Sequence, residues 1–126
     1  MDARLDFAEI FGFRPGDVHV IRNAGGLATD DAIRSLVISQ RMLGTHEVIV
    51  INHTGCGMMT FTDEGMREAL AQETGRTTDL RFGAFTDLET NVREQVDKIR
   101  AHPWLKPVAV HGMIYEVESG RIREIV

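Results

Sequence analysis

The sequence of 126 residues has one cysteine, one tryptophan and one tyrosine. A single cysteine excludes an internal disulfide, which agrees with a reducing compartment and leaves Cys56 free for metal binding or for simple burial. No run approaches the roughly eighteen apolar residues of a membrane helix. Asp2, Asp6 and Glu9 are unlike the start of a secretory signal. These absences predict a soluble, cytoplasmic protein with no membrane partner.

Basic charge is also scarce, because 14 Lys and Arg face 19 Asp and Glu, for a formal net charge of -5. No stretch interleaves Lys or Arg with aromatic residues, so the sequence offers no patch for phosphate backbones, and we expect no nucleic-acid partner. The hydrophobic fraction of 43% and the charged fraction of 26% are those of an ordinary globular protein, and the length is that of one domain.

A strand–helix–strand pattern occupies the first half of the chain. Residues 17–23 are short, β-branched and flanked by glycine, which predicts a buried strand. Thr29 offers an N-cap oxygen to a helix with apolar residues at three-to-four spacing, and Gly44 fits its C′ position. Residues 47–52 follow as a second strand, which is apolar almost throughout, as a strand covered on both faces should be.

The second half predicts two helices and a hairpin. Residues 62–73 favour a short helix, and the Gly-, Thr- and Arg-rich residues 74–83 favour a surface loop. The capping-box pattern of residues 86–89 predicts the start of another helix. Residues 108–117 and 122–126 predict two strands joined by a turn. We therefore expect an α/β fold whose mostly parallel β-sheet has flanking helices and closes with a C-terminal hairpin.

Two soft metal ligands, His53 and Cys56, follow the second strand in the loop His-Thr-Gly-Cys-Gly. Imidazole nitrogen and thiolate sulfur are a pair that zinc prefers. The loop lies at the carboxyl end of a strand, where open parallel sheets bind ligands, and its glycines let the backbone fold tightly. A catalytic zinc normally takes three protein ligands. A buried thiol beside a hydrogen-bonded histidine is the alternative interpretation.

Two further segments are ordinary when taken alone. Asp2-Ala3-Arg4 is a charge pair typical of a solvated surface, and Arg22-Asn23-Ala24-Gly25 is a pattern typical of a turn. Together with the His53–Cys56 loop, however, they resemble the β-class carbonic anhydrases. In that family a Cys-x-Asp-x-Arg segment, an Arg-Asn-Ala-Gly segment and a His-x-x-Cys loop occur in this order. The resemblance runs from Met1 through the last hairpin.

The resemblance implies a zinc-dependent carbonate dehydratase, a lyase that reversibly hydrates carbon dioxide to bicarbonate and a proton. His53 and Cys56 would be two ligands of one Zn²⁺ per subunit, and a zinc-bound hydroxide would attack CO₂. Asp2 would orient that hydroxide, and Arg4 would hold Asp2 ionised and in place. The family also implies a homodimer or a multiple of dimers.

The sequence departs from the family at its start. The family's first zinc ligand is a cysteine directly before the residue that matches Met1, preceded by a core strand and by helices that help build the dimer. We therefore treat residues 1–126 as a single β-carbonic anhydrase-like domain that is N-terminally incomplete. One explanation is that the sequence starts at an internal methionine. The other is a zinc-poor relative, in which Asp2 itself would join His53 and Cys56 on the metal.

Two alternative functions and one role stay open. A catalytically silent relative would keep the fold for oligomer assembly or anion binding. A zinc hydrolase of another small linear substrate, such as carbon disulfide, would keep the metal and change the substrate. A histidine near the site would relay the proton released by hydration, and the sequence does not choose among His19, His46 and His111.

Overall fold

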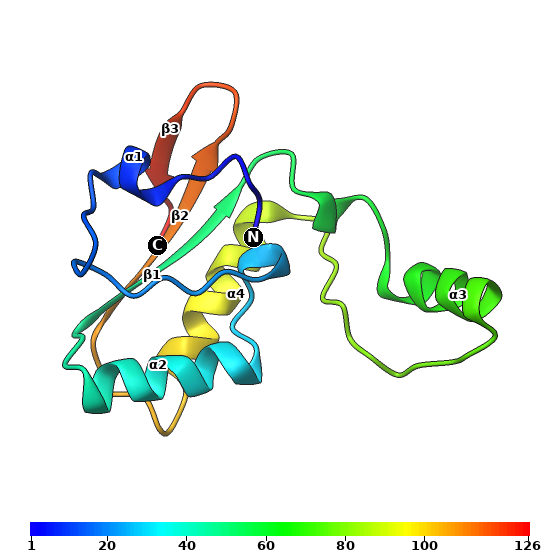
Figure 1. Ribbon diagram of the computed structural model, residues 1–126, viewed down its shortest axis with the longest axis horizontal. Coiled ribbons are helices and arrows are strands. Elements are labelled where there is room, and N and C mark those ends of the chain that lie inside the picture. The colour runs from blue at the N-terminus through cyan, green and yellow to red at the C-terminus, as the bar shows by residue number, and fades with distance from the viewer.

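The computed structural model describes residues 1–126, which form helices on both sides of the first strand in the sequence and end in two consecutive strands (Figure 1). The α-helices are α1 (Phe7–Phe11), α2 (Asp30–Met42), α3 (Asp63–Thr74) and α4 (Leu88–Arg100), the short 3₁₀ helices are η1 (Ala24–Gly26) and η2 (Gly57–Met59), and the strands are β1 (Glu47–His53), β2 (Ala109–Glu116) and β3 (Arg121–Glu124). No helix is both long enough and apolar enough to cross a membrane.

The sheet is mixed and has the order β1-β2-β3. Strands β1 and β2 are parallel, with Glu47 opposite Ala109 and His53 opposite Tyr115, whereas β2 and β3 form the antiparallel C-terminal hairpin. The α/β class, the parallel pair, the flanking helices and the closing hairpin predicted above are confirmed. Because β1 ends at His53, the predicted ligand loop leaves the sheet at a strand's carboxyl end.

The core lies on one face of this sheet. Alternate residues of β1 and β2 are buried there, among them Val50 and Ile114. Helix α4 packs on them with Val92 and Val96, which have no exposed surface. The opposite face is only half-buried, as at Ile51. The complete cover expected on both faces of β1 is therefore not found, and the strand alternates between a buried and a half-buried side.

The predicted strand at residues 17–23 does not form. These residues pair with none of the three strands, and Val18, Val20 and Ile21 are exposed. A strand requires a neighbour for its backbone donors and acceptors as well as β-branched side chains, and this segment has no such neighbour. The segment has the side-chain pattern of a strand, but it lacks the backbone pairing that defines one.

The helix starts follow from side-chain caps. Thr29 caps α2 through an Oγ1 that accepts from the amide of Ala32 at 3.3 Å, as predicted, and Gly44 follows the helix with a φ of 76°. For α4 the predicted capping box is wrong by one position. Asp87, not Thr86, is the N-cap, and its carboxylate accepts from the amide of Thr90 at 2.7 Å.

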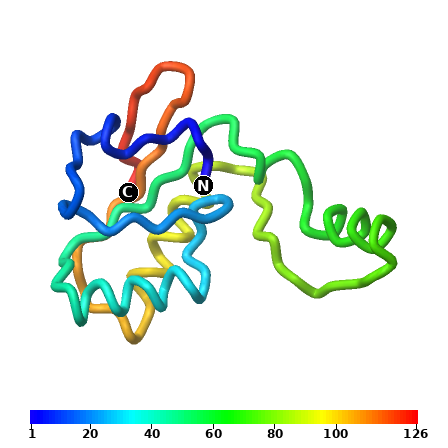
Figure 2. The backbone as a smooth tube through the Cα atoms, viewed as in Figure 1, coloured from blue at the N-terminus to red at the C-terminus, as the bar shows by residue number.

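Helix α3 and the chain that follows it project from the body as an arm (Figures 1 and 2). The helix matches the segment predicted at 62–73 and begins after the cap residue Thr62. None of its residues is fully buried, and residues 75–81 are almost entirely exposed. The predicted surface loop is therefore confirmed. The arm returns to the body just before α4.

Candidate functional site

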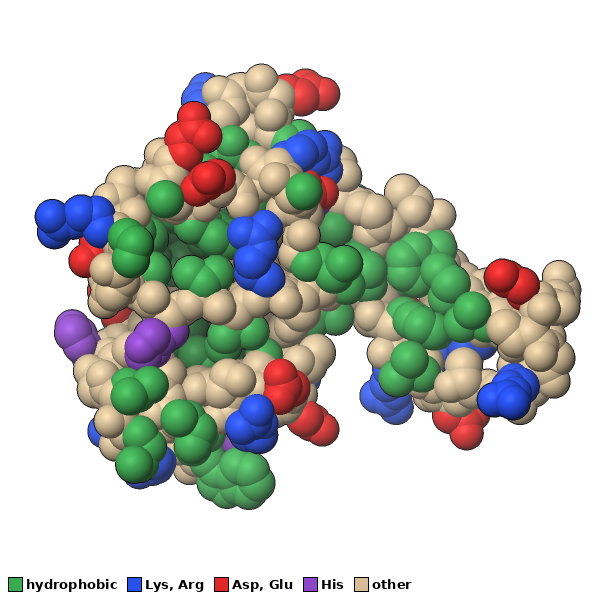
Figure 3. Space-filling view, in the orientation of Figure 1, with side chains coloured by type: hydrophobic (Ala, Val, Ile, Leu, Met, Phe, Trp, Pro, Cys, Tyr) green, Lys and Arg blue, Asp and Glu red, His purple; other side chains and the backbone are tan.

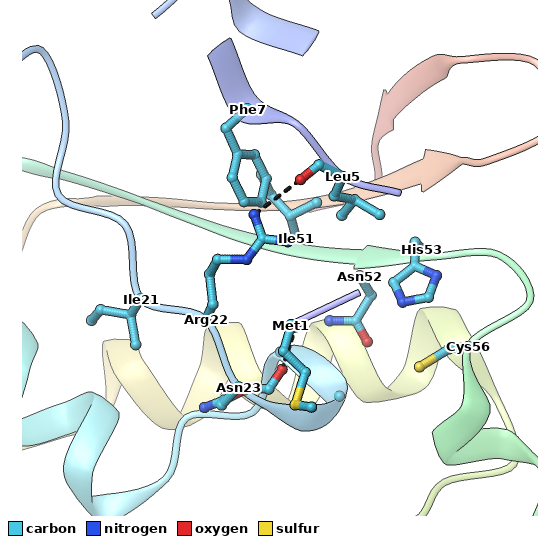
Figure 4. Close-up of a pocket in the computed structure, with 12 residues that line it drawn as sticks. Met1, Leu5, Phe7, Ile21, Arg22, Asn23, Ile51, Asn52, His53 and Cys56 are labelled. Carbon is cyan, nitrogen blue, oxygen red and sulfur yellow. Dashed lines mark hydrogen bonds between the residues drawn. The ribbon is translucent and has the colours of Figure 1, made fainter. Parts of the chain in front are cut away.

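The loop after β1 is fixed at both of its ends. Thr54 donates its amide to the carbonyl of Tyr115 at 3.0 Å, and its hydroxyl accepts from the amide of Val117 at 3.1 Å. Gly55 takes a φ of 62°, a conformation that favours glycine. Cys56 then starts η2, where its carbonyl accepts from the amide of Met59 at 3.1 Å. The turn brings His53 and Cys56 to one side of the strand end (Figure 4).

Both predicted ligands are buried, with 9% of His53 and 6% of Cys56 exposed. The Nδ1 of His53 lies 2.9 Å from the carbonyl oxygen of Thr54. A carbonyl can only accept, so Nδ1 carries a proton, and in the neutral imidazole Nε2 then keeps its lone pair. This is the tautomer in which histidine binds a metal through Nε2.

Asp2 and Arg4 form a bidentate ion pair beside His53. The Nε and Nη2 of Arg4 donate to the two carboxylate oxygens of Asp2 at 2.8 and 2.7 Å, and the amide of Arg4 donates to the same carboxylate at 2.9 Å. These bonds, led by those of the Arg4 side chain, hold the pKa of Asp2 far below its ordinary value. Asp2 Oδ2 lies 3.6 Å from His53 Nε2, and Arg4 Nη2 also donates to the carbonyl of Gly55 at 3.3 Å.

The segment that resembled a turn is one, and it supports both sides of the site. Arg22 donates from Nη1 to the carbonyl of Leu5 at 2.9 Å and from Nη2 to the carbonyl of Asp2 at 2.6 Å. Asn23 brackets η1, since its side chain donates to the carbonyl of Leu27 and accepts from the amide of the same residue. Thus Arg22 places the Asp2 backbone while Asn23 shapes the turn that faces the end of β1.

A pocket of about 50 Å³ lies between these segments, with room only for a small molecule (Figure 4). His53, Cys56 and Asn52 line it from one side, and Arg22 and Asn23 line it from the other. None of the three histidines considered as a proton relay is among its lining residues. His19 Nδ1 lies 2.7 Å from Ser39 Oγ, His111 lies between Glu47 and Glu124, and the His46 side chain makes no hydrogen bond or ion pair.

The residues of the site fit only in part the zinc ion that the family resemblance implies. His53 Nε2 and the Cys56 thiol have the right chemistry for two of its ligands. No group of three or more His, Cys, Asp or Glu side chains is placed to hold a metal ion, so Asp2 does not complete a shell with them. The residues present therefore fit two positions of a zinc site and do not make the three that a catalytic zinc requires.

Sequence reasoning missed a buried chain of amides that holds the end of β1. Asn91 donates to Asn52 Oδ1 at 2.8 Å, Gln95 donates to Asn91 Oδ1 at 3.0 Å, and Gln95 Oε1 accepts from the amide of Ala28 at 3.0 Å. All three amide residues are buried, and Asn52 directly precedes His53. Two amides spaced four residues apart beside the apolar stripe of α4 were a signal that the sequence contained.

Comparisons with known proteins identify the family of this chain. The family model described as carbonic anhydrase matches residues 1–122. Beta-carbonic anhydrase 1 of Mycobacterium tuberculosis is 43% identical over 126 residues, which are 99% of this chain and 77% of that protein. The carbonic anhydrase structure from Streptococcus mutans superposes with a TM-score of 0.96 at 44% identity, over 100% of this chain and 77% of that one.

A second group of relatives has a different name. Carbon disulfide hydrolase of Acidithiobacillus thiooxidans is 39% identical over 145 residues, which are 98% of this chain and 72% of that protein. This identity is lower than the 43% and 44% of the two carbonic anhydrases named above, and the family match covers nearly the whole chain. The chain therefore belongs to the β-carbonic anhydrase family.

Proposed function

We propose that this chain catalyses the reversible hydration of carbon dioxide to bicarbonate and a proton at the pocket beside His53. The family membership supports the reaction. The observation that carries the assignment of residues is the Arg4 side chain, which bonds Asp2 with Nε and Nη2 and also reaches the carbonyl of Gly55 in the ligand loop. One guanidinium thus links the acidic residue to the loop of His53 and Cys56.

In this proposal Asp2 only accepts hydrogen bonds, and Arg4 holds its carboxylate in one orientation. The bonds from Arg4 keep its carboxylate ionised across the physiological pH range, because they lower its pKa. An ionised carboxylate can only accept, so water or hydroxide in the pocket must turn a proton toward Asp2 and an oxygen lone pair away from it. A carbon dioxide molecule facing that lone pair is then attacked at carbon, and a C–O bond forms as one C=O π bond opens. Hydroxide gives bicarbonate directly, and water gives it once one of its two protons has left for the solvent.

His53 and Cys56 are proposed as two ligands of a Zn²⁺ ion, one per subunit. A bound zinc ion supplies hydroxide near neutral pH, because it lowers the pKa of water from 15.7 to about 7. The Nδ1 bond to Thr54 directs His53 Nε2 toward such an ion, and burial keeps the Cys56 thiol out of bulk water. The chain by itself presents only these two donors, so the test below measures metal and activity separately.

The assay is stopped-flow hydration of CO₂ with a pH indicator, together with metal analysis of the purified chain. We expect activity that follows zinc content, that falls on chelation and that drops at least about a hundredfold in Asp2→Asn, the size of effect of a lost catalytic group. Asp79→Asn is the matched control, because Asp79 is exposed in the loop of the arm and its side chain makes no hydrogen bond or ion pair. A zinc-loaded chain with no activity above buffer would overturn the proposal and favour a silent relative.

Carbon disulfide is the second substrate to measure, because the relatives named for its hydrolysis are up to 39% identical. We expect hydration of CO₂ to exceed release of sulfide from carbon disulfide by the same preparation. The reverse order would move the chain to that branch.

We further propose that the chain works in the cytoplasm as a homodimer or a multiple of dimers. The projecting arm supports assembly, since α3 buries no residue and hydrophobic side chains are exposed on the arm and where it joins the body (Figure 3). Leu80 of the arm and Met59 of η2 are among the exposed hydrophobic residues of the chain. The free Cys56 thiol supports a reducing compartment. Sedimentation equilibrium tests the assembly, and a monomer at micromolar concentration would contradict it.

A further inference from the structure

Asp63, the first residue of α3, carries a set of contacts that the proposed reaction does not use. Its carboxylate accepts hydrogen bonds from three consecutive backbone amides in the chain that returns from the arm, those of Phe82 at 3.0 Å, Gly83 at 3.3 Å and Ala84 at 2.8 Å. Arg67 Nη1 lies 3.8 Å from the same carboxylate. These bonds lower the pKa of Asp63, so the anion persists in mild acid.

The segment that Asp63 holds rests against the loop of Cys56. Phe85, the next residue, donates its amide to the carbonyl of Met58 at 3.2 Å, and Met58 is buried. The chain before α4 and η2 lie side by side at this point (Figure 1). Met58 is two residues beyond Cys56 and belongs to the same 3₁₀ turn.

The same segment also meets the turn on the other side of the pocket. A Cβ placed on Gly83 would come within 2.4 Å of Leu27 Cδ1, so the backbone of Gly83 packs directly on that side chain. Leu27 is the residue bracketed by Asn23, and Gly25 of η1 faces both Leu27 and Met58. Three segments distant in sequence therefore pack together behind Cys56.

We propose that Asp63 is a positioning residue of this site: its carboxylate fixes residues 82–84, which press Met58 and Leu27 together and so keep the Cys56 turn closed. The role in catalysis rests on the function proposed above, but the contacts and the closure of the turn do not. In this proposal the arm also has a structural role within the chain, because its first residue holds the segment that packs on the Cys56 turn. Besides Asp63, Arg67 ties α3 to the returning chain through a hydrogen bond from its Nη1 to the carbonyl of Leu80 at 3.4 Å.

Cys56 is a direct reporter, because it is the only cysteine of the chain and is buried. Its rate of alkylation by iodoacetamide in the presence of a chelator measures how often the turn opens. Asp63→Asn keeps the shape of the side chain but loses its charge and turns an amide donor toward the backbone N–H groups. We expect alkylation to accelerate about tenfold, as loss of charge-assisted hydrogen bonds predicts.

Glu64→Gln is the matched control. Glu64 shares the first turn of α3, so its substitution removes the same charge from the same helix end, but it is exposed and has no side-chain partner. We expect it to alkylate at the wild-type rate. Hydrogen exchange supplies the second readout: the amides of residues 82–85 should lose protection in Asp63→Asn while those of β1 and β2 keep theirs. That contrast separates opening of the turn from loss of global stability.

Equal alkylation rates in Asp63→Asn and Glu64→Gln, with residues 82–85 still protected, would overturn the proposal. If Asp63→Asn shows no cooperative unfolding transition, Asp63→Glu serves in its place, because it keeps the charge and misplaces the oxygens by one methylene. We then expect acceleration of about threefold, and the wild-type rate would again overturn the proposal. No measurement in this experiment needs zinc or CO₂, so its outcome does not depend on whether the proposed activity is found.

Discussion

Three glycines with left-handed backbone offer a graded test of how tightly η1 is built against β1. Gly44, Gly25 and Gly26 have φ values of 76°, 80° and 59°, so alanine at any of them meets the same backbone strain. Their surroundings differ. A Cβ at Gly44 would have no atom within 4 Å, at Gly25 it would lie 3.3 Å from two side-chain atoms, and at Gly26 it would lie 2.8 Å from the carbonyl oxygen of Ile51 and from Asn52 Nδ2.

Left-handed backbone alone should cost Gly44→Ala about 1–2 kcal/mol. Gly26→Ala adds a clash with backbone that cannot rotate away, and overpacking of this kind costs a further 1–3 kcal/mol, for a total of roughly 2–5 kcal/mol. Gly25→Ala should fall between them, because the side chains of Leu27 and Met58 can move a few tenths of an ångström.

The assay is urea unfolding of the three variants and the wild type, followed by circular dichroism and analysed with one slope. Using Gly44→Ala as reference removes the shared strain, so that the difference reports only the approach of η1 to β1. Gly26→Ala unfolding at the same urea concentration as Gly44→Ala would refute the close packing on which the position of Asn52 and His53 depends.

Three further predictions concern the buried amides, the helix cap and the ion pair. Asn91→Ala should lower the free energy of unfolding in urea by about 2–4 kcal/mol, because Asn52 Oδ1 and Gln95 Nε2 both lose a partner in the core. Glu94→Ala, on the exposed face of α4, should lower it by less than about 0.5 kcal/mol. Equal unfolding midpoints for the two variants would contradict the network. Asp87→Ala should lower the thermal midpoint and Thr86→Ala should leave it in place, since only Asp87 caps α4; the opposite order would restore the capping box. In Arg4→Met the pKa of Asp2, followed by carboxyl-carbon NMR, should rise toward its ordinary value of 3.8, whereas Arg93→Met, at an exposed residue without a partner, should leave it low. A carboxyl whose pKa is lower in the folded state stabilises the fold at pH values above its unfolded pKa, and this stabilisation is lost as the pH falls. The wild type should therefore lose stability in acid more steeply than Arg4→Met.

Local signals in the sequence predicted most of the fold. Helix α2 follows from the cap at Thr29 and the apolar spacing after it, and β1 follows from a run of β-branched residues beside a helix. The failures have different physical causes. Residues 17–23 have the side chains of a strand, but pairing depends on a neighbour that lies elsewhere in the chain. The α4 cap failed for a different reason, because two adjacent polar residues both fit and the backbone chose Asp87.

The site was predictable as a list of residues and not as an arrangement. The pattern of the loop indicated His53 and Cys56, and Asp2 and Arg4 came from the resemblance alone, since a charge pair two residues apart is ordinary. No sequence rule places Asp2 Oδ2 3.6 Å from His53 Nε2, because Arg22 makes that approach by binding the carbonyl of Asp2 across 20 residues. Asp63 gave no such local signal, because its carboxylate acts on backbone amides 19 to 21 residues away. The amides of α4 did carry one, in their spacing of four residues.

The two halves of the site are held by different kinds of interaction. His53 and Cys56 are buried, and the end of β1 that precedes them is tied to α4 by the hydrogen bond between Asn91 and Asn52. Asp2 and Arg4 belong to residues 1–13, of which only Leu5 is buried, so hydrogen bonds with substantial solvent contact hold them in place. Exposed bonds contribute less than buried packing, so the N-terminal segment can leave the pocket at a lower free energy than the core unfolds. Separation of Asp2 from the ligand loop, rather than loss of the fold, is therefore the first failure that this architecture permits.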